Sequence, residues 1–77
     1  MYLTDLKSKL ETNQKIPADS YSLTGGLPNE SLCIARTSGH WEVYYSERGS
    51  KSNLKMFQNE AEACEYFYFA LLKMLNI

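Results

Sequence analysis

Residues 31–57 carry three short segments of strand character, separated by two glycine-containing turns. In the middle segment, Trp41, Val43 and Tyr45 alternate with more polar neighbours, so they fall on one side of an extended chain. In the last segment, Leu54 also shares a face with Met56. Short turns join antiparallel neighbours, so the pattern predicts a three-stranded antiparallel meander with one covered face. The segments are SLCIART (31–37), HWEVYYSE (40–47) and SNLKMF (52–57), and the turns are Ser38-Gly39 and Arg48-Gly49-Ser50.

A helix is predicted on either side of these strands. Near the start of the chain, leucines recur at spacings of three and four, which is typical of a short amphipathic helix over residues 2–12. After the strands, Asn59 and Glu62 have the spacing of a helix N-cap and its partner, and the following pattern predicts a helix to about Leu75. The leucines of the first helix are Leu3, Leu6 and Leu10.

The 77 residues are enough for one domain, spanning 1–77, with a single small core. The predicted fold is α+β with the order α-β-β-β-α, in which both helices pack on one face of a three-stranded antiparallel sheet. Residues 13–30 contain two prolines and the Gly25-Gly26 pair, which indicate turns and loop. Apolar side chains within that segment predict that it packs on the core, and these are Ile16, Tyr21, Leu23 and Leu27.

Charge and cysteine content narrow the functional classes. Eight basic and nine acidic residues give a formal net charge of −1, which disfavours nucleic-acid binding driven by bulk charge. Cys33 and Cys64 lie among apolar residues without metal-ligand spacing, so we expect two reduced core thiols rather than a disulfide or a metal site. The first 13 residues do not have the pattern of a signal peptide, and no apolar run approaches membrane-spanning length. We expect a soluble, cytoplasmic protein without membrane partners.

Catalytic signals are weak throughout the chain. His40, the only histidine, shares a strand face with Glu42, but one such pair is more often structural than an acid-base or metal site. The segment TGGLPN lacks the lysine and the strand-to-helix context of a phosphate-binding loop. We therefore expect no enzymatic activity, no catalytic residues, no metal and no cofactor.

The last helix contains four consecutive aromatic residues, Tyr66, Phe67, Tyr68 and Phe69. A helix turns about 100° per residue, so the four rings must point in four directions. A helical wheel places Phe67 and Tyr68 on the core side, whereas Tyr66 and Phe69 fall among polar residues. Tyr66 and Phe69 can be isolated exposed rings, or the first helix or the 13–30 segment can cover them. Alternatively, they form a partner-binding surface, because aromatic residues ringed by charge are typical interface anchors.

The α-β-β-β-α order is also that of double-stranded-RNA-binding domains, which place lysines at the start of the last helix. Here that start reads NEAEACE, and its three carboxylates would repel a phosphate backbone. A double-stranded-RNA-binding domain is therefore only the runner-up hypothesis, and a self-associating accessory subunit is a third possibility. Basic residues do occur around the strands, and they are Arg36, Arg48, Lys51 and Lys55; ordinary solubilising charge accounts for them.

The stretch WEVYYSERGSKSNLKMFQNEAEACEYFY resembles small immunity proteins encoded beside bacterial polymorphic toxins, including those of contact-dependent growth inhibition. The resemblance lies in a tryptophan strand ending in Tyr-x-Glu-Arg-Gly, a third strand closing on phenylalanine, and an acidic, alanine-containing helix start. The upstream segment IPADSYSL, residues 16–23, adds to it. The matching residues are Trp41, Tyr45, Glu47, Arg48, Gly49, Phe57, Glu60, Ala63 and Cys64.

The resemblance implies a stoichiometric inhibitor that binds one cognate toxin domain, often a nuclease with a basic cleft. The residues themselves, rather than the resemblance, indicate which surface would bind the toxin. Glu60, Glu62 and Glu65 would supply electrostatic complementarity, and Tyr66 and Phe69 would be desolvated anchors.

Overall fold

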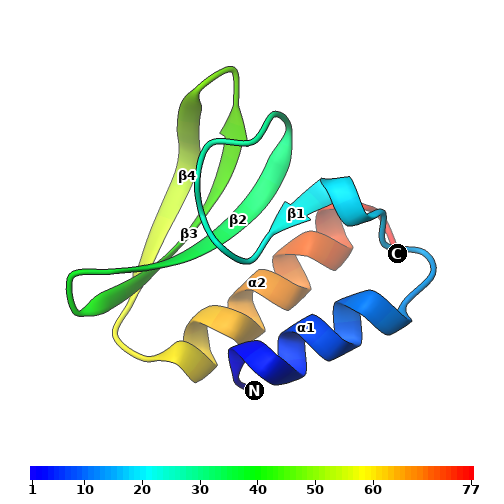
Figure 1. The fold of residues 1–77 in the computed structure, drawn as a ribbon, viewed down its shortest axis with the longest axis horizontal. Coiled ribbons are helices and arrows are strands. Elements are labelled where there is room, and N and C mark those ends of the chain that lie inside the picture. The colour runs from blue at the N-terminus through cyan, green and yellow to red at the C-terminus, as the bar shows by residue number, and fades with distance from the viewer.

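The computed structural model describes residues 1–77, whose elements are a helix, four strands and a second helix (Figure 1). The first helix ends where the leucine spacing predicts, and the last begins at its predicted N-cap. The α+β class is confirmed. The elements are α1 (Leu3–Thr12), the short 3₁₀ turn η1 (Ala18–Ser20), β1 (Tyr21–Ser22), β2 (Ser31–Thr37), β3 (His40–Glu47), β4 (Ser50–Phe57) and α2 (Glu60–Met74).

The sheet is mixed and four-stranded, so the prediction of a three-stranded antiparallel sheet was wrong in its details. Its strand order is β1-β2-β3-β4, with β2, β3 and β4 forming the predicted antiparallel meander. The additional strand, β1, pairs parallel to β2, with Tyr21 opposite Leu32 and Ser22 opposite Cys33. Two residues are too few to show an alternating pattern, so the sequence of β1 cannot be distinguished from that of the surrounding loop.

Both predicted turns form and set the sheet register. Ser38-Gly39 and Arg48-Gly49 each have two consecutive residues with positive φ, at 27° and 86° and at 51° and 77°. This is the backbone of the two-residue turns that match strand twist. Each turn brings its flanking residues opposite one another, and these pairs are Thr37 with His40 and Glu47 with Ser50.

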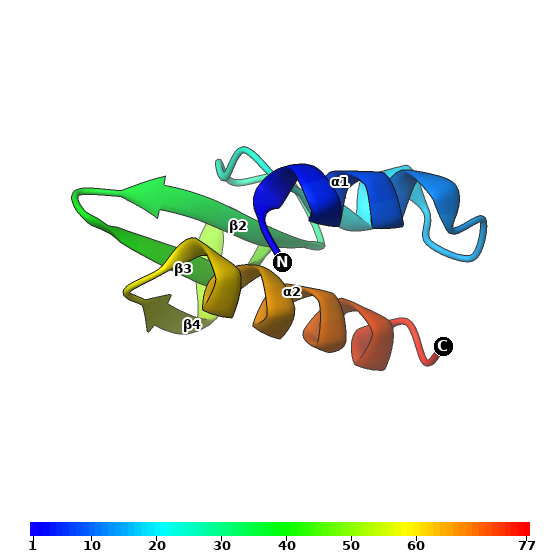
Figure 2. The same ribbon diagram turned by 90° about the horizontal axis from the view of Figure 1, so that it is seen from below.

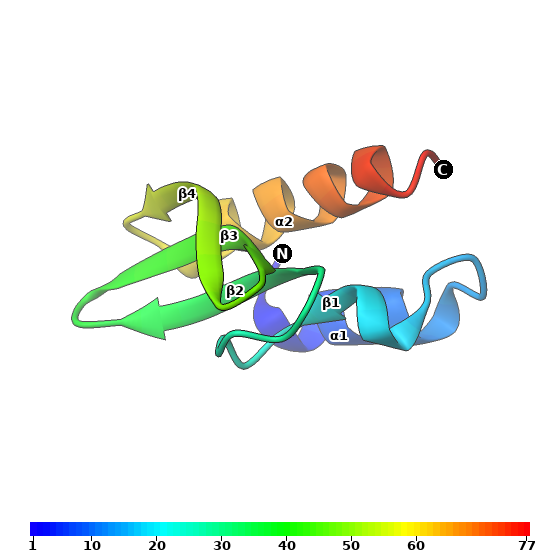
Figure 3. The same ribbon diagram turned by 90° about the horizontal axis from the view of Figure 1, so that it is seen from above.

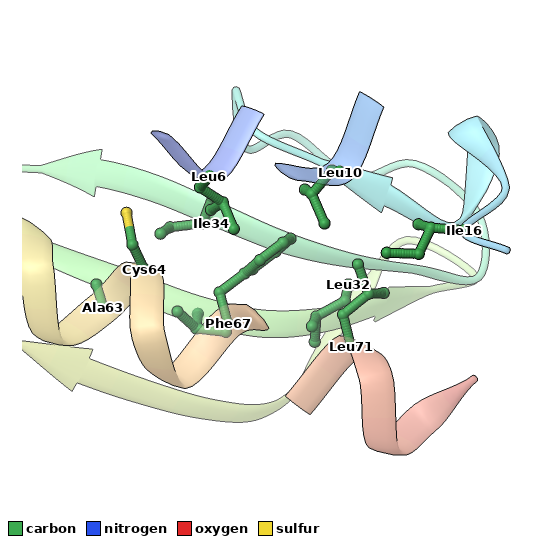
Figure 4. Close-up of a cluster of buried hydrophobic side chains, with 10 residues drawn as sticks. Leu6, Leu10, Ile16, Leu32, Ile34, Ala63, Cys64, Phe67 and Leu71 are labelled. Atoms are coloured by element: carbon green, nitrogen blue, oxygen red, sulfur yellow. The ribbon is translucent and has the colours of Figure 1, made fainter. Parts of the chain in front are cut away.

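The two helices lie side by side against one face of the sheet, as predicted (Figure 2). The core between them is a cluster of buried side chains from α1, α2, β2 and β3, with Phe67 at its centre (Figure 4). Ile16 joins this cluster, and Tyr21 and Leu23 pack against it, as expected for the 13–30 segment. Leu27 was expected there too, but it is exposed. The cluster comprises Leu6, Leu10, Ile16, Leu32, Ile34, Val43, Ala63, Cys64, Phe67 and Leu71.

The loop between β1 and β2 covers part of the opposite sheet face, crossing in front of β2 in Figure 1. Tyr44 is buried beneath it, and its hydroxyl donates a hydrogen bond to the carbonyl oxygen of Gly26 at 2.7 Å. A Cβ atom on Gly25 would lie only 2.8 Å from the Cβ of Ala35. The loop therefore lies directly against β2 at this point. Strands β2 to β4 are seen from above in Figure 3.

The cysteines are both free and buried, on opposite sides of the sheet. Cys64 belongs to the helix-side cluster, and Cys33 neighbours Tyr44 on the loop-covered side. Burial raises the pKa of the Cys33 thiol, and it raises the pKa of the Cys64 thiol to about 11. None of the helices combines the length and the apolar character needed to cross a membrane.

The close approach of the loop to β2 leads to a first prediction. Gly25→Ala should lower the free energy of unfolding by at least about 1 kcal/mol more than Gly39→Ala, measured by chemical denaturation. Both glycines have positive φ, at 74° and 86°, so both substitutions carry the same backbone strain. Only at Gly25 does the new Cβ meet a neighbour. Equal losses would show that the loop does not lie against Ala35.

Burial of Cys64 leads to a second prediction, on pH. The unfolded chain loses the Cys64 proton near the thiol's ordinary pKa of 9.0, whereas the folded protein keeps it until about pH 11. The folded state therefore binds more protons in this window, and the free energy of unfolding should fall as pH rises through it. The decline should be shallower in Cys64→Ala between pH 8.5 and about 9.5, below the ordinary tyrosine pKa of about 10. An unchanged slope would contradict the burial of this thiol.

Candidate protein-binding surface

The four consecutive rings of α2 divide between core and solvent. Phe67 is completely buried, as predicted. Tyr68 is half-buried at the seam with α1, where Lys9 Nζ lies 5.8 Å from its ring centre. Tyr66 remains 37% exposed and Phe69 66% exposed. Phe69 therefore faces solvent, whereas Tyr66 is partly covered.

The two exposed rings differ in how firmly they are held. The Tyr66 ring packs against the Phe57 ring at the end of β4, with a centroid separation of 5.2 Å. The nearest aromatic ring to Phe69 is Tyr68, edge-on, with a centroid separation of 6.1 Å. Tyr66 is therefore partly supported by the sheet, whereas Phe69 projects from the helix.

The three carboxylates predicted beside these rings have different surroundings. Glu60 is half-buried, and its Oε2 accepts a hydrogen bond from the Leu3 backbone N–H at 2.6 Å, which ties the start of α1 to the start of α2. Glu62 takes part in the helix cap: its N–H donates to Asn59 Oδ1, and its Oε1 accepts from Asn59 Nδ2, each at 2.8 Å. Glu62 and Glu65 are both exposed. The exposed part of the predicted set is therefore Glu62, Glu65, Tyr66 and Phe69.

An apolar groove of about 320 Å³ lies beside Tyr66, between α2 and the sheet. Sequence reasoning did not find it. Tyr66, Ala70 and Met74 recur at a spacing of four, which indicates one helical stripe, but the helical wheel assigned Tyr66 to the polar side of the helix. The groove is lined from the helix by Tyr66, Ala70 and Met74, and from the sheet by Tyr45, Asn53 and their neighbours.

A bulge in β4 brings Asn53 into this groove. Tyr45 pairs with Ser52 and Val43 with Lys55, so Asn53 and Leu54 together stand opposite Tyr44. Asn53 has φ of 54°, a left-handed conformation that asparagine tolerates better than most residues. Leu54, within the bulge, is 40% exposed, and Met56, beyond it, is 61% exposed.

The only histidine belongs to a small ionic cluster on the sheet. His40 Nε2 and Lys51 Nζ each lie 3.5 Å from a carboxylate oxygen of Glu42. Lys51 also lies 4.6 Å above the ring of Tyr44, so the lysine is shared between a carboxylate and an aromatic face. No three His, Cys, Asp or Glu side chains are grouped so that they could hold a metal ion.

The basic residues noted near the strands are spread over the hairpins rather than gathered on one patch. Arg36 pairs with Trp41 near one end of β3, and Arg48 lies in the turn at its other end. Lys51 is engaged with Glu42, and Lys55 stands opposite Val43 on β4.

Comparison of the chain with models of known protein families, with curated proteins and with solved structures found no match.

The division of the rings leads to a third prediction. Phe67→Leu should lower the free energy of unfolding by about 1 kcal/mol or more, because a fully buried ring leaves a poorly filled space. The same change at Phe69 should alter it by less than about 0.5 kcal/mol. Denaturant titrations of the two variants provide the comparison. A loss at Phe69 as large as that at Phe67 would mean that the Phe69 ring is covered in the folded protein.

Proposed function

We propose that this protein is a binding module that neutralises a cognate bacterial toxin domain by one-to-one association. The observation that carries the proposal is Phe69, a large ring that is 66% exposed on a capped helix, one turn after the exposed carboxylate of Glu65. The sequence resemblance to immunity proteins supplies the class of partner.

The exposed rings support a binding role because of what they would gain on association. Burying a phenylalanine side chain fully stabilises by about 1.5–3 kcal/mol, and most of this gain is still available at Phe69. Aromatic residues that become desolvated at the centre of an interface often dominate its affinity. Tyr66, three residues earlier on the same helix, would extend the contact.

The rigidity of α2 supports the same role. Its inner face contributes Phe67 and Leu71 to the buried cluster, and its first turn is held by the Asn59 cap and by the contact of Glu60 with Leu3. A partner would therefore meet side chains on a preformed helix, and little ordering would oppose binding.

The carboxylates support a cationic partner. Glu62 and Glu65 are exposed on the N-terminal half of α2, near Phe69. Nucleases bind phosphate backbones through basic clefts, and an acidic surface is attracted to such a cleft at a distance. The complementarity would raise the association rate and help to select this class of toxin.

The proposal is tested by co-expression with the product of the neighbouring reading frame. We expect that frame to be toxic alone, growth to be restored by this protein, and a stable one-to-one complex to form. Phe69→Ala should raise the Kd of the complex roughly 30-fold, the effect of a hot-spot truncation of about 2 kcal/mol. Leu54→Ala, a change at another exposed apolar side chain, is the matched control and should leave Kd within about threefold.

The charge contribution is measured in the same complex. Glu65→Gln should slow association at low salt and change little at high salt, because long-range attraction is screened. A harmless neighbouring frame, or a toxic one that this protein neither binds nor neutralises, would overturn the proposal.

A further inference from the structure

The strand β4 is a free edge of the sheet. The strand order places β4 at one end and β1 at the other, and β1 is only two residues long whereas β4 has eight. A long edge strand presents backbone N–H and C=O groups that can pair with another extended chain. Few of its residues are covered, and Leu54 and Met56 are exposed along it.

The sheet register shows which backbone groups are available. Glu47 and Ser50 flank the two-residue turn, so the backbone N–H and C=O groups of Ser50 point toward β3. Every second residue of an antiparallel strand then directs its backbone groups toward the same neighbour. Past the bulge, the backbone groups of Lys55 and Phe57 point toward β3. The backbone N–H and C=O of Met56, between them, therefore point away from β3 to the open side of the sheet.

The apolar groove reaches this edge. Asn53, at the bulge of β4, lines it together with Tyr45 of β3 and the α2 stripe of Tyr66, Ala70 and Met74. A strand added beside β4 would therefore run along a groove between a sheet edge and a helix. In this binding mode, main-chain hydrogen bonds supply affinity and a pocket for alternate side chains supplies specificity.

Charge identifies the kind of strand that fits. β4 carries Lys51 and Lys55 and no carboxylate. Lys51 is already engaged with Glu42, so the lysines left to meet a partner are Lys55 and Lys73, which lies next to Met74 on α2. A β4 strand from a second copy would add two more lysines to this edge and no carboxylate, and like charges on neighbouring strands repel. An acidic strand would instead be attracted, which distinguishes this edge from the acidic N-terminal half of α2.

We propose that the β4 edge and the adjoining groove bind an extended acidic segment of a partner protein, which adds a fifth strand to the sheet. One bulky apolar side chain of that segment would enter the groove between Tyr66 and Met74, and flanking carboxylates would meet Lys55 and Lys73. The site goes beyond the toxin-binding surface proposed at Phe69, and no toxin is needed to test it.

The probe is a synthetic peptide of sequence TDTFTDT, acetylated and amidated, titrated to millimolar concentration into the ¹⁵N-labelled full chain. Its two acidic residues and its phenylalanine share one face when it is extended. We expect amide shifts concentrated at residues 51–57 and 66–74, and slower hydrogen exchange of the Met56 amide because it gains an acceptor.

Three matched changes separate strand addition from simple hydrophobic contact. A peptide N-methylated at alternate amides on its pairing edge should bind at least about tenfold more weakly, since it loses main-chain donors. The peptide TKTFTKT should also bind at least about tenfold more weakly, because it reverses the charge. In the protein, Met74→Glu places a like charge at the groove on an already exposed position and should weaken binding of TDTFTDT, while Leu27→Ala, an exposed change on the loop, should not.

Several outcomes would overturn the proposal: no shift at millimolar peptide, shifts confined to residues 60–69, equal binding of the N-methylated peptide, or concentration-dependent shifts of β4 without peptide, which would indicate pairing with a second copy. Tyr66 borders both surfaces, but toxin neutralisation is tested through co-expression and Phe69→Ala, so the two proposals fail separately.

Discussion

Phe67 lies fully buried where α2 meets α1 and the sheet, and the remaining architecture depends on its packing. A domain of this size has one small core, so few side chains can be spared from it. Phe67 and Leu71 fix which side of α2 faces inward, and α1 then closes over Leu6 and Leu10 (Figure 4). Once that side is fixed, the helical repeat determines the direction of every neighbouring ring.

The same constraint explains why an aromatic surface is left over. The two helices lie beside one another on one face of the sheet. Each helix therefore has one arc of side chains that contacts the core and another that is exposed to solvent. Phe69 falls in the solvent arc, and Tyr66 falls at its border, where the bulged β4 leaves a groove instead of a closed contact. The α2 helix therefore builds the core with one side and offers the other for binding, and the groove lies between the two.

Local patterns were sufficient for most of the fold. The alternation of residues 40–47, the turns after Thr37 and Glu47, and the leucine spacing of α1 each express one physical preference within a few residues. The missed features depend on distant partners. β1 exists because Tyr21 and Ser22 meet β2, and the bulge exists because residue 53 adopts a left-handed conformation that its asparagine identity permits but does not require.

For the candidate surface, a helical wheel was enough to assign Phe67 to the core and Phe69 to the solvent side. It could not show that Glu60 turns toward the Leu3 backbone, because that contact joins residues 57 positions apart. Nor could it show the groove, whose walls come from three strands and a helix.

The central claim is that α2 leaves Phe69 uncovered in the free protein while burying Phe67. Hydroxyl-radical footprinting with residue-level mass spectrometry measures the oxidation of all four rings in one experiment, on dilute folded protein. The account predicts that Phe69 reacts nearly as fast as in the unfolded chain, that Tyr66 and Tyr68 react at intermediate rates, and that Phe67 is strongly protected. Comparable protection of Phe69 and Phe67 would contradict it, because the ring assigned to a partner would then already be covered.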